Sequence, residues 1–123
     1  MEDKVDKIVA LLMHSRNQTH IYHLQTSSFA KHKALQEYYD SIVDLIDSLA
    51  ETYQGKYGVI KSITVPKSIE SLTSEDDPSR YLKRVASYVE DNRQTPPDGE
   101  LQNIFDEILA LLSKTFYLLD TLE

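Results

Sequence analysis

Cysteine is absent from this chain of 123 residues, which excludes disulfides, thiolate metal sites and a thiol nucleophile. Glycine is scarce, and two of the three glycines lie close together at positions 55 and 58, a pattern typical of long helices. No apolar run approaches the eighteen or so residues that cross a bilayer, and the acidic N-terminus lacks the apolar core of a signal peptide. We therefore expect one domain, residues 1–123, in the cytoplasm.

The chain also has fewer basic than acidic residues. Thirteen Lys and Arg residues face twenty Asp and Glu residues, which gives a net charge of −7. Such a surface repels phosphates, so direct DNA binding is not expected, whereas attraction of cations is favoured.

Apolar residues recur at helical spacing in four segments, a pattern that predicts an all-α fold. Thr26, Ser27 and Ser28 offer N-cap hydroxyls for the second helix. Asp77 is an expected N-cap, Pro78 suits a first turn, and Gly55 suits a position just past a helix end. The leucine-rich last segment is typical of either a central helix or an oligomer contact. The four helices are expected at about residues 2–25, 28–54, 78–93 and 96–122.

The segment between the second and third helices, residues 56–75, is a candidate crossover. Its β-branched part, residues 59–65, predicts a short strand or an extended chain. About twenty residues suffice to traverse a bundle, so helices two and three are predicted to be parallel neighbours in a four-helix bundle.

Four potential metal ligands stand out: His20, His32, Asp47 and Glu51. His32 and Asp47 are roughly 22 Å apart along a helix, whereas a metal holds its nitrogen and oxygen ligands at about 2 Å. Either these residues are unrelated, or two copies of the helix run antiparallel and join the histidines of one to the carboxylates of the other. The second reading predicts a symmetric dimer with a shared site.

These residues belong to a longer motif. The sequence His20-x11-His32-x3-Gln36-x2-Tyr39-Asp40-x5-Ile46-Asp47-x-Leu49-Ala50-Glu51 resembles the signature of the mini-ferritins, the DNA-protection-during-starvation proteins. The chain is also similar to short ferritin-like proteins encoded by large tailed bacteriophages, in which case the expected location is the host cytoplasm.

The mini-ferritin resemblance implies a ferritin-like four-helix bundle with a ferroxidase centre between two-fold-related subunits. By matching position, His20 and His32 would bind iron together with Asp47 and Glu51 of the partner, and the iron would be oxidised there. Tyr39 and Asp40 would lie near the two-fold axis.

The chain departs from the family at several positions, which keeps alternatives open. Gln36 stands where the family usually carries a carboxylate, so it is a weaker candidate ligand, and His23 could substitute for His20. His14 is expected at the surface. No histidine has a Glu three residues before it, so a di-iron site within one bundle is not expected.

The oligomer could be a dimer or a closed shell. The alternative function is a metal-free ferritin-like protein with a structural or regulatory interaction role. Gln36 is the feature that discriminates between this function and iron binding.

Overall fold

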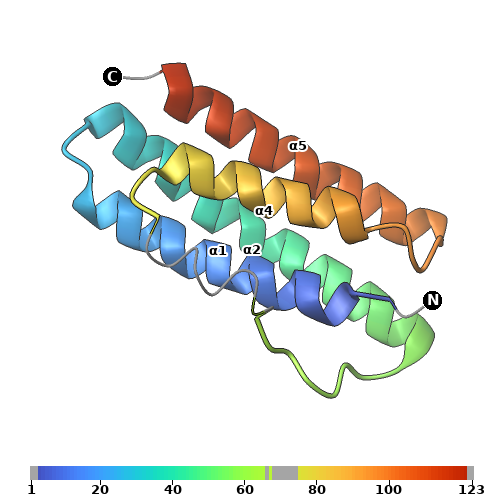
Figure 1. Ribbon diagram of the computed structural model, residues 1–123. Helices are drawn as coiled ribbons and strands as arrows, with labels where there is room; N and C mark the ends of the chain where they lie inside the picture. The colour runs from blue at the N-terminus through green and yellow to red at the C-terminus, as the bar shows by residue number, and fades with distance from the viewer. Residues whose placement is uncertain (1–2, 66, 68–74, 122–123) are drawn as a thin grey trace.

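The chain forms four α-helices in the computed structural model, which describes residues 3–65, 67 and 75–121 (Figure 1). Within these ranges there is no strand, and residues 59–65 follow α2 without regular structure. None of the described helices combines the length and apolar character that crossing a membrane requires. The helices are α1 (Val5–Gln25), α2 (Phe29–Tyr57), α4 (Pro78–Asn92) and α5 (Gly99–Thr121).

Local side-chain chemistry sets two of the helix starts. The Ser28 hydroxyl accepts a hydrogen bond from the backbone N–H of Lys31 at the start of α2. The Asp77 carboxylate does the same for Ser79 at the start of α4, with Pro78 in the first turn. Both residues therefore satisfy N–H groups that a helix leaves without internal partners.

The end of α2 differs from the expectation. Gly55 does not terminate the helix, which continues to Tyr57 and ends at Gly58. Gly58 has a φ of 95°, a conformation that glycine adopts far more readily than other residues.

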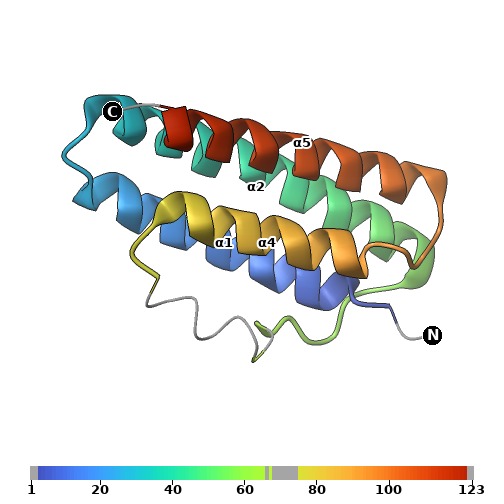
Figure 2. The same cartoon turned by 45° about the horizontal axis from the view of Figure 1, so that its top comes forward.

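Neighbouring helices all run antiparallel. Figures 1 and 2 show α1 and α5 running one way and α2 and α4 running the other. The packed pairs are α1 with α2, α2 with α5, α5 with α4 and α4 with α1. Helices α2 and α4 are therefore parallel, as predicted, but they lie diagonally and are not neighbours. Of the expected crossover, residues 66 and 68–74 lie outside the described part, as do Glu2 and Leu122 of the expected first and last helices.

Apolar side chains from all four helices form one core. Its largest fully buried members include Tyr38, Tyr81, Phe105, Leu35 and Leu82. Helix α5 contributes one face to this core, and Leu109, Leu111 and Leu118 beside that face are only partly buried. The last helix is thus one of four equivalent walls and not the centre of the bundle.

Polar groups inside this core are paired. The Ser15 hydroxyl donates to the Leu12 carbonyl at 2.7 Å and lies 2.7 Å from the Tyr38 hydroxyl. The Thr19 hydroxyl donates to the Ser15 carbonyl. Among the described residues, no buried side-chain nitrogen or oxygen lacks a hydrogen-bond partner. The core therefore avoids the cost of unpaired polar atoms.

Candidate functional site

Two histidines join α1 to α2 next to the turn between them. The Nδ1 atom of His23 lies 2.7 Å from the His32 carbonyl, and the Nδ1 atom of His32 lies 2.8 Å from the His23 carbonyl. A carbonyl can only accept, so each Nδ1 carries the proton and donates it. The two rings stack with their centroids 3.5 Å apart.

This arrangement fixes the chemistry of His32. Because Nδ1–H is occupied by a backbone carbonyl, the neutral ring keeps its lone pair on Nε2. Metal-binding histidines usually make this kind of outer bond, which orients the ring and sets its tautomer. His32 is half-buried and His23 is buried, so His32 is the more accessible of the two.

His20 lies on the exposed side of α1 and packs against Tyr39 of α2. The two rings stack with centroids 4.5 Å apart and an interplanar angle of 24°. His20 is also 6.0 Å from His23, measured between ring centroids. Three histidines and one tyrosine thus gather at one end of the surface where α1 and α2 meet.

The carboxylates of the expected site lie further along α2. Asp47 and Glu51 are exposed, one helical turn apart, as are Asp40 and Asp44 before them. In the described part of the chain, none of the four forms a hydrogen bond or an ion pair through its side chain. Like charges at this spacing repel each other, and together they make this face of α2 negatively charged.

A shallow groove runs beside Asp47 between α1 and α2. It encloses about 380 Å³ and combines apolar and charged groups. Its lining is Met13, Arg16, Asn17, Val43, Ile46 and Asp47.

A single chain does not assemble the expected ligands. Within residues 3–65, 67 and 75–121, no three His, Asp or Glu side chains are placed to hold one metal ion. His20 and His32 lie near the α1–α2 turn, and Asp47 and Glu51 lie about half the length of α2 away. Gln36 is exposed on α2 between the two groups.

The sequence did not reveal the His23–His32 pair. We expected His23 only as a substitute ligand for His20, whereas the His23 ring stacks on the ring of His32. Nine residues separate the two histidines, and the turn between them determines whether their rings meet. The only sequence signal was the capping Ser28, which marks the start of α2 just before His32.

Comparison with known proteins places this chain in a family. The model of a family of unknown function (DUF5856) matches residues 23–119, so the chain belongs to that family. This range contains α2, α4, all but the end of α5, and the last residues of α1.

One relative is a phage protein. It is the uncharacterized 14.6 kDa protein in the mobD-ri intergenic region of Enterobacteria phage T4, 28% identical over 117 residues. The alignment covers 94% of this chain and 88% of the relative, which supports a bacteriophage origin. Neither the family nor this relative carries a ferritin name, and no solved structure matches.

Proposed function

We propose that this protein is ferritin-like and binds ferrous iron between two antiparallel copies, where the iron can then be oxidised. His20 and His32 of one copy would provide nitrogen ligands, and Asp47 and Glu51 of the second copy would provide oxygen ligands. The proposal rests on the positions of a histidine and several carboxylates along α2. A histidine with a fixed tautomer and a free Nε2 stands near one end of its exposed face, and unpaired carboxylates stand further along.

The register of α2 supports this pairing. Fifteen residues separate His32 from Asp47, or roughly 22 Å of helix. Two antiparallel copies that cross near Tyr39 and Asp40 would bring His32 of one beside Asp47 of the other. The same crossing would give the carboxylates a cation to neutralise them, which removes their mutual repulsion.

The topology supports a ferritin-like bundle. A parallel, diagonal pair of helices, α2 and α4, requires a connection that returns along the bundle, as in ferritin-like folds with one long crossover. That bundle architecture holds metals on its helices in other proteins.

The ligand chemistry suits ferrous iron. Imidazole nitrogen and carboxylate oxygen together are typical ligands for this ion. With hydrogen peroxide as the oxidant, two ferrous ions each give up one electron, and peroxide takes up two electrons and two protons to leave two waters. The protein's part is to hold the ions where the oxidant can reach them.

Ferrous titration tests the proposal. Iron binding is measured without oxygen by calorimetry, and oxidation is then followed by absorbance after peroxide is added. We expect His32→Ala and Asp47→Ala each to abolish both signals. Asp91→Asn, a substitution on the exposed side of α4, serves as the control. Oxidation that is unchanged in His32→Ala and Asp47→Ala would refute the ferroxidase function.

Mixing the two inactive variants tests whether the site is shared. In a mixed dimer, one of the two sites takes its histidines from the Asp47→Ala chain and its carboxylates from the His32→Ala chain, so it is intact. Random pairing should therefore restore about a quarter of the binding sites. No recovery after confirmed subunit exchange, or a protein that stays monomeric, would rule out the shared site.

A metal-free interaction role on the same face is the second candidate. Large apolar side chains are exposed around the α1–α2 turn: Ile21 at 44%, Leu24 at 72% and Phe29 at 75% of their full exposure. Apolar surface of this kind often marks a protein contact. If Leu24→Ser with Phe29→Ser breaks the dimer, while ferrous iron binds neither the natural chain nor any variant, this role replaces the first.

A further inference from the structure

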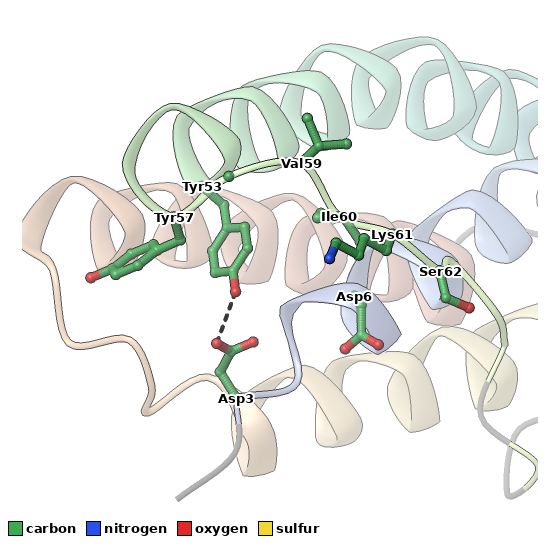
Figure 3. Close-up of a pocket in the computed structure, with 9 residues that line it drawn as sticks. Asp3, Asp6, Tyr53, Tyr57, Val59, Ile60, Lys61 and Ser62 are labelled. Carbon is green, nitrogen blue, oxygen red and sulfur yellow. Dashed lines mark hydrogen bonds between the residues drawn. The ribbon is translucent and has the colours of Figure 1, made fainter.

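A pocket at the opposite end of α2 has no role in the proposed iron site. It encloses about 410 Å³ where the start of α1, the end of α2 and residues 58–62 meet (Figure 3). This volume lies within the range of small-molecule sites. Its principal side chains are Asp3, Asp6, Tyr53, Tyr57, Ile60 and Lys61.

The pocket is built by specific contacts. The Tyr53 hydroxyl donates to the Asp3 carboxylate at 2.9 Å, and the rings of Tyr53 and Tyr57 lie 5.2 Å apart between centroids. The Tyr57 hydroxyl donates to Asp98 at 2.5 Å, which holds its ring at the pocket. Hydrogen bonding and the nearby carboxylates add to burial in raising the pKa of Tyr53 to about 12, so its hydroxyl stays a donor at neutral pH.

The segment after α2 is fastened in the same way. The backbone N–H of Ile60 donates to the Gln54 side-chain oxygen at 3.1 Å. A few residues on, the Lys7 ammonium donates to the Thr64 hydroxyl at 2.9 Å. Residues 58–62, which form the wall of the pocket opposite the two helices, are therefore held against α1 and α2.

Asp6 and Lys61 are the two charged groups of this pocket that have no partner among the described residues. Asp6 is half-buried, and its carboxylate makes no hydrogen bond or ion pair within the described residues. Lys61 lines the same pocket and forms no ion pair there either. Figure 3 shows Asp3 and Asp6 on the α1 side of the pocket, with the Asp3 carboxylate pointing toward the Tyr53 hydroxyl and the Asp6 carboxylate directed away from Lys61 in this view.

We propose that this pocket binds an organic cation, the ammonium or guanidinium group of a short aliphatic chain. Asp6 would pair with the charge, and the faces of Tyr53 and Tyr57 would pack against the chain and the cation. Aromatic faces attract organic cations directly. A metal ion fits less well, because no three His, Asp or Glu side chains of the described residues are placed to hold one.

Lys61 acts as an internal competitor in this proposal. Its ammonium group can reach across the pocket toward Asp6 when no ligand is present, and a bound cation must displace it. Removing Lys61 should therefore tighten binding, whereas removing the charge of Asp6 should weaken it. If Asp6 instead only stabilises the first turn of α1, replacing Lys61 should leave the affinity for the ligand unchanged.

The test is a titration with agmatine, a four-carbon chain with a guanidinium at one end and an ammonium at the other, followed through amide NMR shifts. Saturable shifts are expected at residues 3–6 and 57–62. Asp6→Asn should raise the dissociation constant about fivefold or more, and Lys61→Met should lower it, relative to the control Asp91→Asn. Equal affinities for Asp6→Asn and Asp91→Asn, or shifts spread over the whole molecule, would overturn the proposal.

One more variant and two more ligands extend this titration. Tyr57→Leu removes an exposed ring at the pocket, so it should weaken binding even if Asp6→Asn fails to fold. A peptide with one internal arginine, compared with agmatine, distinguishes a protein side chain from a free amine as the source of the cation. An uncharged alkylurea of the same length should not bind, and equal binding of the urea would also contradict the proposal.

Discussion

His23 and His32 brace each other, since each ring donates its Nδ1–H to the main-chain carbonyl of the other residue. The brace spans the α1–α2 turn and stacks the two rings at 3.5 Å. One pair of side chains therefore both fixes the geometry of the turn and leaves the Nε2 atom of His32 available on the surface of α2.

Removing either ring should destabilise the fold. We expect His23→Ala and His32→Ala each to lower the free energy of unfolding by about 1–2 kcal/mol, because each loses a hydrogen bond and the ring stack. The double variant should lose less than the sum, by about 0.5–1 kcal/mol, because the stack is counted in both single variants. Urea unfolding followed by circular dichroism measures all three.

His20→Ala is the matched control for this cycle. His20 is exposed and makes ring contacts with Tyr39 and His23, but it forms no hydrogen bond within the described residues. Its loss should therefore change stability by less than the loss of His23 or His32. A strictly additive double variant would show that the ring stack contributes nothing.

Tyrosine ionisation should divide the eight tyrosines into classes. Burial raises the pKa of Tyr22 to about 12, and it raises the pKa values of Tyr38 and Tyr81 further. These groups hold their protons more tightly in the folded state. Their contribution to stability is thus complete below pH 10, the ordinary pKa, and is lost as pH rises through the folded values.

Absorbance of the phenolate form, measured against pH, checks this order. Tyr38 and Tyr81 should ionise only when the chain unfolds, so Tyr38→Phe should remove signal from the unfolding step alone. A titration in which all eight tyrosines ionise together below the unfolding transition would contradict the burial of Tyr38.

His14 should make stability fall at mildly acidic pH. It was expected at the surface but is half-buried, with Nδ1 2.6 Å from the Tyr81 hydroxyl. Burial lowers the pKa of His14 below 6.5, so the folded state favours the neutral ring. Stability is therefore full above pH 6.5 and is lost as pH falls toward the lowered value, because the unfolded chain binds the proton more readily.

Urea midpoints at about pH 7.5 and pH 5.5 measure this effect. In His14→Gln, which keeps a hydrogen-bonding group but cannot titrate, the drop between the two values should be smaller. Glu75 and Asp76 line the same cavity as His14 and are present in both proteins. Any effect of these two acids on the pH dependence is therefore the same in both proteins. An equal drop in both proteins would assign the acid sensitivity to other groups.

Local chemistry explains why the starts of α2 and α4 could be predicted. Ser28 and Asp77 cap their helices with their own side chains, and these contacts span only two or three residues. The end of α2 was predicted wrongly because the choice between two nearby glycines depends on contacts that the residues after Gly55 make. Two glycines offered an end, and the bonds from Tyr57 to Asp98 and from Ile60 to Gln54 favour the later one.

The candidate site also has features that the sequence predicts and features that it does not. The spacing of His32, Asp47 and Glu51 along one helix follows directly from the sequence, and so does the exposure of the two carboxylates, whereas His32 is half-buried. The partnership of His23 with His32 depends on how two helices meet across a turn. The pocket between Asp6 and Tyr53 joins segments nearly fifty residues apart, and no local pattern marks it.

The antiparallel order of neighbouring helices has an electrical consequence. Each helix carries partial positive charge at its start and partial negative charge at its end. With two helices pointing each way, these contributions largely cancel over the whole bundle. The long-range field around the molecule therefore comes from its ionised side chains, whose excess of seven negative charges draws small cations from every direction.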